Sequence, residues 1–142
     1  MVITECALEH VPQAPQAIME IKRVVRPGGY LYVVVPFLFP FHEAPNDYFR
    51  WTKSGLMAAF PDFEPVEAGV WAGPMTTLIG YISTLFAVVF SFGSNRLAMV
   101  LMYSVLILLA PLKLLDPLFR PFPRVADVSA IVYFFGRRTV GS

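Results

Sequence analysis

The stretch Ala14–Pro36, APQAIMEIKRVVRPGGYLYVVVP, decides the fold expected for this chain. Apolar residues recur at helical spacing from Ala14 to Arg26, and the basic residues gather at the far end, where the helix dipole favours them. The Gly28-Gly29 pair then turns the chain into Tyr30–Pro36, a continuous apolar run typical of a strand covered on both faces. With the apolar and β-branched stub Met1–Thr4 ahead of it, this stretch predicts a βαβ unit in a parallel sheet.

Length and composition limit the class of protein. A chain of 142 residues suits one domain, and its hydrophobic fraction of 56% is high while its charged fraction of 15% is low. A formal net charge of +1 without any Lys/Arg run excludes a nucleic-acid-binding protein. The chain is therefore unusually apolar for a globular domain.

The single cysteine and the N-terminal residues indicate a cytosolic protein. Cys6 is the single cysteine, so no internal disulfide forms, and no Cys/His spacing is typical of a metal site. We therefore expect no bound metal. The N-terminal residues lack the basic start and apolar stretch of a secretion signal. The expected location is the cytoplasm, with membrane association as a further expectation developed below.

Two polar segments follow the two predicted strands. Thr4–His10, TECALEH, comes after the stub, and His42–Thr52, HEAPNDYFRWT, comes after Tyr30–Pro36. Ligands of parallel α/β sheets bind beyond the carboxyl ends of the strands, so both segments are expected at one edge. A solvated loop is the alternative for His42–Thr52. The mixture of His, Asp, Tyr, Arg and Trp favours a ligand site.

The residues around these strands resemble a known family. Cys6–Phe37, CALEHVPQAPQAIMEIKRVVRPGGYLYVVVPF, is similar to the second half of class I S-adenosylmethionine-dependent methyltransferases, with their Leu-Glu-His-Val segment, helix and Pro-Gly-Gly turn. His42–Leu56, HEAPNDYFRWTKSGL, resembles a loop of one subgroup, the type 11-like enzymes. The resemblance runs from Val2 to about Gly73. It implies an α/β fold with a partial Rossmann-like methyltransferase sheet and S-adenosyl-L-methionine as the cofactor of the complete enzyme.

Part of the family's cofactor site is missing from this sequence. Such enzymes hold the cofactor's methionine end with a glycine-rich loop and its ribose with an acidic residue after the second strand, and no G-x-G-like loop occurs here. The chain begins at about the family's fourth strand. We therefore expect the carboxyl-terminal part of a methyltransferase, a truncated gene product or mis-assigned start that is inactive by itself.

The resemblance assigns roles to residues in both segments. His42 is the candidate catalytic base, because an imidazole accepts a proton at neutral pH, and Asp47 is expected to orient it or to bind the acceptor. The cofactor-binding candidates are Glu5, Cys6, Ala7, Leu8 and His10. The candidates for binding an anionic or sugar-like acceptor are Tyr48, Arg50 and Trp51.

Each role has a structural alternative. His10 is equally well explained as a residue at the start of a helix that is satisfied by backbone groups. Asp47 and Arg50 suit a local ion pair, and Thr52 is expected to be the N-cap of the next helix. Cys6 is expected to be a small buried hydrophobe whose thiol pKa is not lowered.

An apolar insertion comes after the predicted strand Phe63–Gly73. Met75–Phe92 is long enough for a transmembrane candidate and Leu97–Leu112 falls slightly short, with a turn between them that predicts a helical hairpin. Pro111 and Pro117 are expected to break the helical structure after this hairpin, and Val128–Phe135 is expected to be a strand that rejoins the sheet. The expected domains are 1–74 (methyltransferase part), 75–122 (hairpin) and 123–142 (last strand and tail).

The predicted hairpin bears on two hypotheses for the function of this chain. Its runs are apolar all round, which favours membrane association over a homodimer interface through 75–112. The leading hypothesis is a methyltransferase fragment acting on a hydroxyl-bearing small-molecule, glycan or lipid-linked acceptor. The alternative is a non-enzymatic membrane-associated fragment or interaction module with a degenerate methyltransferase fold.

Overall fold

The structure is a computed structural model that describes residues 1–42 and 46–140, and it divides into two units. Unit 1 comprises Met1–Phe37, Phe41–Trp71 and Ile131–Ser142. Unit 2 comprises Leu38–Pro40 and Ala72–Ala130. The expected domain limits at residues 74 and 122 stay predictions.

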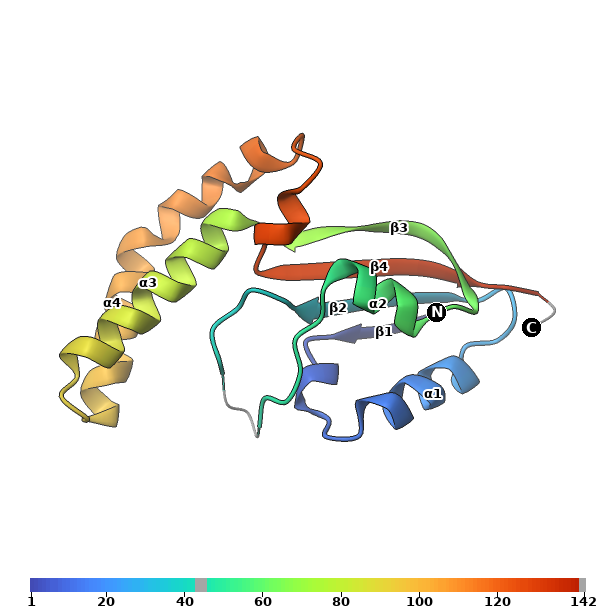
Figure 1. The fold of residues 1–142 in the computed structure, drawn as a ribbon, viewed down its shortest axis with the longest axis horizontal. Helices are drawn as coiled ribbons and strands as arrows, with labels where there is room; N and C mark the ends of the chain where they lie inside the picture. The colour runs from blue at the N-terminus through green and yellow to red at the C-terminus, as the bar shows by residue number, and fades with distance from the viewer. Residues whose placement is uncertain (43–45, 141–142) are drawn as a thin grey trace. The chain divides into compact units, whose positions relative to one another are not determined.

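A four-stranded sheet organises unit 1 in the order β1 (Val2–Glu5), β2 (Tyr30–Pro36), β4 (Ile131–Arg138) and β3 (Phe63–Ala72) (Figure 1). β1 and β2 are parallel, with Glu5 opposite Val34, as the βαβ prediction requires. β2 and β4 are antiparallel, so the sheet is mixed. The α/β class with a Rossmann-like sheet is confirmed.

The last strand begins later than the sequence indicated. Val128 was expected to open it, but Val125–Val128 forms the 3-10 helix η3, and β4 starts at Ile131. The Ser129 hydroxyl donates to the Val125 carbonyl at 2.6 Å and closes this turn. A local side-chain to backbone bond therefore competes with the β-propensity of the valines.

Two helices flank the sheet in unit 1. α1 (Ala14–Val24) stops two residues earlier than expected, and the Arg138 guanidinium donates to the carbonyl of Lys22 at 2.6 Å near this end. The turn after α1 needs glycine, since Gly28 has a φ of 72°. α2 (Lys53–Ala59) begins at the N-cap Thr52, as predicted.

The core of unit 1 lies on one face of β2. Leu31, Val33 and Val35 are fully buried there, and they form one cluster with Ile18 of α1, Leu56 of α2, Phe60, Val132 and Phe134. The prediction that both faces of β2 are covered is confirmed toward its carboxyl end, where Val34 is 2% exposed and Pro36 is buried on the opposite face, and it fails at Tyr30. On the other face the rings of β2 and β4 pack on one another, and Tyr30 stays exposed.

Unit 2 contains the predicted hairpin. α3 (Pro74–Phe90) and α4 (Asn95–Leu109) run side by side in opposite directions (Figure 1). Gly93, with a φ of 81°, lies in the turn between them, and the Ser94 hydroxyl caps α4 by accepting from Leu97 N–H. Asp116 holds the start of α3, accepting from Met75 N–H at 2.8 Å and from the Thr76 hydroxyl at 2.7 Å.

The prolines do not end the second helix. α4 continues as the 3-10 helix η2 (Ala110–Phe119), with Pro111 in its first turn and Pro117 inside it. Among the described residues, Asn95–Phe119 is therefore the one helix long and apolar enough to cross a membrane by length and composition, with a mean hydropathy of 2.2. α3 has 17 residues, so the assignment of the longer span to the first run is wrong.

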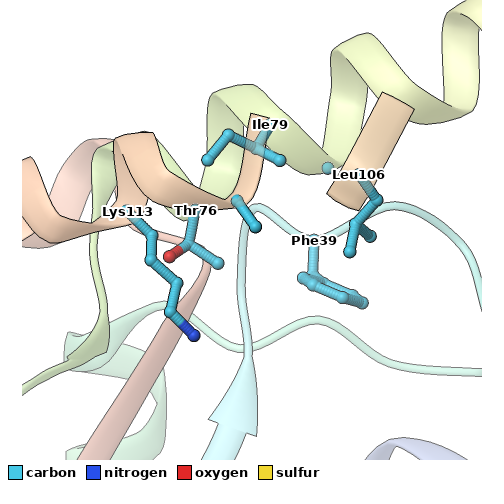
Figure 2. Close-up of a pocket in the computed structure, with 7 residues that line it drawn as sticks. Phe39, Thr76, Ile79, Leu106 and Lys113 are labelled. Atoms are coloured by element: carbon cyan, nitrogen blue, oxygen red, sulfur yellow. The ribbon is translucent and has the colours of Figure 1, made fainter. Parts of the chain in front are cut away.

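A small apolar cavity lies within unit 2. Its volume is about 210 Å³, and Phe39, Ile79 and Leu106 line it together with Thr76, Gly80, Ala110 and Lys113 (Figure 2). Gly80 sits close to Pro40, where an added Cβ would lie 3.2 Å from the proline ring. The cavity is shaped by the close approach of the Leu38–Pro40 segment to α3.

Candidate functional site

The two polar segments meet at the carboxyl ends of β1 and β2. β1 leads into the 3-10 helix η1 (Leu8–His10), and β2 leads into the segment that contains His42 and Asp47. Tyr48 N–H donates to the Glu9 carbonyl at 2.7 Å and joins the segments. The expectation that both segments share one edge of the sheet is confirmed.

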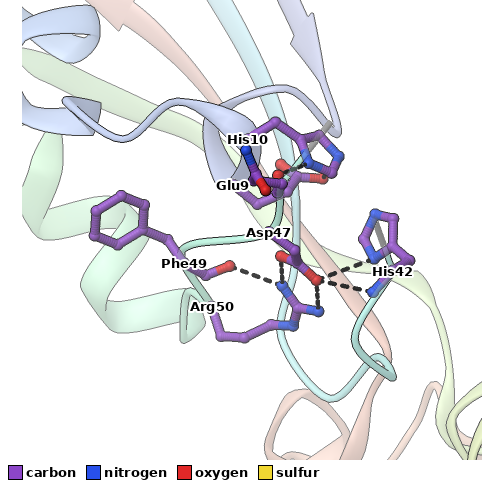
Figure 3. Close-up of polar contacts among 7 residues, drawn as sticks. Glu9, His10, His42, Asp47, Phe49 and Arg50 are labelled. Atoms are coloured by element: carbon purple, nitrogen blue, oxygen red, sulfur yellow. Dashed lines mark hydrogen bonds and ion pairs between the residues drawn. The ribbon is translucent and has the colours of Figure 1, made fainter. Parts of the chain in front are cut away.

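A chain of ionisable side chains runs from Arg50 through Asp47 to His42 (Figure 3). The Asp47 side chain is 1% exposed, and its carboxylate accepts hydrogen bonds from both Nη atoms of Arg50. It also accepts from His42 N–H at 3.0 Å and lies 3.4 Å from His42 Nδ1. The expected local ion pair of Asp47 with Arg50 is therefore present, and the Asp47 carboxylate lies beside His42.

This arrangement keeps Asp47 ionised. The hydrogen bonds from Arg50 are the main cause that lowers the pKa of the Asp47 carboxyl to about 2, and the bond from His42 N–H adds to them against the opposing effect of burial. Arg50 is fixed further by donating to the Phe49 carbonyl at 2.9 Å. His42 thus faces a permanent negative charge on its Nδ1 side.

Glu9 and His10 lie on the other side of His42. His10 Nδ1 bonds the Asn46 carbonyl, so the backbone partner expected for His10 is present, and its Nε2 lies 3.8 Å from Glu9 Oε1. The rings of His10 and His42 meet edge to face with centroids 5.0 Å apart. One donor atom from each of Glu9, His10 and His42 lies within 4.8 Å of the other two.

Glu9 is the residue that the sequence analysis missed. Its side chain is fully buried, and neither carboxylate oxygen accepts a hydrogen bond from a described residue. Burial raises the pKa of the Glu9 carboxyl, while electrostatic attraction to His10, His42 and Arg50 opposes the shift. The only signal for Glu9 was its position between two expected site residues, because η1 turns it inward.

The expected cofactor residues differ in accessibility. Glu5, Cys6 and Ala7 are all exposed at the end of β1, whereas the Leu8 side chain is 2% exposed and packs in the core. The prediction that Cys6 is buried is wrong, because the chain leaves the strand there with a φ of 44°. Desolvation, helped by Glu9 and Glu5, raises the pKa of the Cys6 thiol to about 11.

The expected acceptor residues are also placed differently from one another. Tyr48 is 48% exposed beside the cluster, and Arg50 is engaged by Asp47. Trp51 packs against the core, and its Nε1 makes no hydrogen bond to a described residue. Residues 43–45 of the expected loop motif lie outside the described residues. The catalytic and binding roles remain predictions.

Comparison with known proteins bears on the first part of the chain. Residues 1–33 match a family model described as a methyltransferase domain. No curated protein matches the sequence. The crystal structure of the [4+2]-cyclase SpnF is similar with a TM-score of 0.45 and 17% identity, covering 98% of this chain and 49% of that chain.

The chain thus spans about half the length of that structure. The family match covers the β1, α1 and turn segments from which the resemblance was read. Over residues 1–33 the chain is therefore similar to a methyltransferase domain, as its sequence indicated.

Proposed function

We propose that this chain forms the acceptor side of an S-adenosylmethionine-dependent methyltransferase that methylates a hydroxyl group. The observation that carries the proposal is the Arg50–Asp47–His42 chain at the carboxyl ends of β1 and β2. A buried carboxylate beside an imidazole is the arrangement that orients a general base. The family match over residues 1–33 supplies the reaction class.

His42 acts as the base in this proposal. With Nδ1 directed at Asp47, the other ring nitrogen, Nε2, is the atom that takes the acceptor proton. The imidazolium that forms is stabilised by the Asp47 carboxylate, which Arg50 keeps ionised. Loss of the proton gives the acceptor oxygen negative charge, and this more nucleophilic oxygen forms the new C–O bond.

The described residues fit one border of the cofactor. Glu5 and Cys6 are exposed at the carboxyl end of β1, which is the edge where parallel α/β sheets bind ligands. When bound, S-adenosylmethionine supplies a methyl group on a sulfonium whose sulfur retains the electron pair of the broken C–S bond. The nine glycines include no G-x-G pair for the methionine end.

The acceptor is proposed to be a hydroxyl-bearing small molecule, glycan or lipid-linked compound. Tyr48, next to Asp47 in the chain, offers an exposed ring, which suits stacking on a sugar or other flat apolar face. The partly exposed guanidinium of Arg50 adds positive charge near the same place. An acceptor with both a hydroxyl and an anionic or sugar-like group fits these contacts.

The test is methyl transfer measured as S-adenosylhomocysteine formed with hydroxyl-bearing acceptors. In a longer, active protein that contains this chain, His42→Ala is expected to lower turnover by about 10²- to 10⁴-fold with little change in cofactor affinity. Glu20→Gln, an exposed carboxyl change on α1, is the control and should leave turnover unchanged. Equal turnover in His42→Ala and the unchanged protein would remove His42 as the base.

Cofactor binding gives a second measurement. The 142-residue chain is expected to bind S-adenosylmethionine weakly or not at all in calorimetry, because no glycine-rich loop is present to hold its methionine end. Micromolar binding by this chain would contradict the proposal that it forms the acceptor side alone.

A second candidate function is a membrane-associated module. It is supported by the 25-residue apolar helix Asn95–Phe119, whose apolar window is 0% buried in the structure. Val88 on α3 is 68% exposed and Ile107 on α4 is 70% exposed. Apolar side chains exposed in such number suit a lipid surface or a protein partner.

Liposome flotation distinguishes binding to a lipid surface from binding to a protein partner. An arginine at the centre of a lipid-embedded helix costs roughly 2.5–3.5 kcal/mol, so Leu106→Arg, near the middle of Asn95–Phe119, should release the protein from vesicles. Val88→Arg lies near the end of α3 and should weaken vesicle binding less. Val66→Arg, at an exposed apolar position on β3, should leave flotation unchanged. A wild-type chain that does not float, and that becomes monomeric in size-exclusion chromatography after Val88→Arg, would favour a homodimer and refute the membrane candidate.

A further inference from the structure

We infer that Glu9, His10 and His42 form a binding site for one divalent transition-metal ion, with Zn²⁺ as the representative ion. These residues bring one carboxylate and two imidazoles within 4.8 Å of one another. The set joins both histidines of the chain to a buried carboxylate that accepts no hydrogen bond from a described residue. The inference goes beyond the proposed function, because ion binding requires neither cofactor nor acceptor.

Glu9 provides the strongest reason for an ion. Its carboxylate is 0% exposed, and both oxygens lack a hydrogen-bond donor among the described residues. The distance of 3.8 Å from His10 Nε2 is too long for a hydrogen bond. Buried carboxylates are ordinarily paired or coordinate metals, since an uncompensated buried charge is costly. A cation between Glu9 and the histidines would compensate it.

The histidines are oriented as metal ligands. Ligating histidines direct their second ring nitrogen to a carbonyl or carboxylate, which fixes the tautomer and leaves the other nitrogen for the ion. His10 directs Nδ1 to the Asn46 carbonyl, and His42 directs Nδ1 to Asp47 (Figure 3). In this arrangement Nε2 of each ring is the atom proposed to bind the ion. In His10 this Nε2 is the atom that faces Glu9.

The donor set indicates the kind of ion. Two imidazoles and one carboxylate are the ligands of catalytic Zn²⁺ sites and of some Fe²⁺ sites, whereas Mg²⁺ and Ca²⁺ prefer oxygen ligands. Ligands about 2.0–2.2 Å from one tetrahedral ion lie roughly 3.3 Å from each other. The donor atoms, at up to 4.8 Å, would therefore close in by about 1 Å or less each on binding.

An ion at this site would change the part played by His42. An imidazole coordinated through Nε2 has no lone pair left to accept the acceptor proton. Three protein ligands leave a fourth position open, and a hydroxyl coordinated there has a lowered pKa. Metal binding would therefore replace the general-base route rather than add to it.

Metal titration of the 142-residue chain tests the inference. After chelator treatment, Co²⁺ is added and its visible absorption is followed, and Zn²⁺ is then used to displace it. We expect one ion per chain and intense tetrahedral Co²⁺ bands. His10→Ala, His42→Ala and Glu9→Gln should each abolish saturable binding, and Asp47→Asn should weaken it by about 10- to 100-fold. Glu20→Gln should bind as the wild type does.

A measurement on the unchanged chain guards against misfolded variants. Since the protein has two histidines, its ¹⁵N imidazole spectrum contains two sets of signals, and Zn²⁺ should shift the Nε2 resonance of both. Absence of stoichiometric binding, or a Zn²⁺ response confined to one histidine, would overturn the metal site. Either result would leave the His42 base proposal standing, while a chain that binds Zn²⁺ but transfers no methyl group would leave the metal site standing.

Discussion

Replacing Asp47 by asparagine tests how the site is held together. The substitution keeps the size of the side chain but removes the charge that Arg50 and His42 surround. A carboxyl whose folded pKa is about 2, against an ordinary value of 3.8, corresponds to about 2 kcal/mol of folding stability at neutral pH, at 1.36 kcal/mol per pH unit. Because Asp47 is almost fully buried, solvent screening should reduce this little.

The sign of the pH dependence follows from the direction of the shift. The folded pKa of Asp47 is lowered, so the stabilisation is complete above 3.8 and is lost as the pH falls through about 2. Asp47→Asn should therefore lower the free energy of unfolding by about 2 kcal/mol at pH 7. The difference from wild type should shrink between pH 4 and pH 2. Urea denaturation followed by tryptophan fluorescence measures both values.

The chain offers a matched control with the same spacing. Asp127 pairs with Arg124 three residues away, but their side chains are 58% and 89% exposed. Asp127→Asn should change stability by less than about 0.5 kcal/mol, since exposed ion pairs contribute little. If Asp47→Asn were no worse than Asp127→Asn at pH 7, or if its deficit were unchanged at pH 2, the account of the buried pair would be wrong.

Thr52→Ala should cost about 1 kcal/mol by removing the cap on Gly55 N–H, as urea denaturation would show, whereas a change below about 0.3 kcal/mol would contradict the cap. Phe60→Ala should cost about 3–5 kcal/mol in the same measurement, because this fully buried ring stacks in the core of unit 1. Metal-free Glu9→Gln should gain stability relative to wild type as the pH rises above 4.5, because the folded pKa of Glu9 is raised; a constant difference across pH 4 to 7 would speak against burial of its charge. Iodoacetamide should alkylate Cys6 roughly 100-fold more slowly in the folded chain than in urea at equal pH, as expected for a thiol pKa of about 11 against 9.0, and equal rates measured by mass spectrometry would refute the shift.

Local patterns were sufficient for the elements of this protein. The helical spacing of Ala14–Arg26, the Pro-Gly-Gly turn and the apolar run of β2 each act over a few residues, and the structure contains all three. The Thr52 cap and the helical hairpin were predicted for the same reason. The strength of such signals lies in short-range backbone geometry and in the periodic exposure of side chains.

The contacts between residues distant in the chain were decided by the tertiary structure. Sequence patterns do not reveal that β4 pairs antiparallel with β2, because this pairing joins the backbone edges of two strands about 100 residues apart in the chain. They likewise left Pro111 and Pro117 as helix ends, although the chain continues through them as a 3-10 helix. Such outcomes depend on contacts that no local window contains.

The candidate site also combines residues grouped by the sequence with residues brought together by the tertiary structure. His42, Asp47 and Arg50 stand within nine residues, so their grouping was readable in the sequence. Glu9 lies in the cluster because η1 turns its carboxylate inward. Cys6 is exposed because the chain takes a left-handed turn at that residue. The residue types that could do chemistry were determined by the sequence alone. Which of them are buried together was decided by packing between η1 and the segment after β2, because burial is a property of the assembled chain.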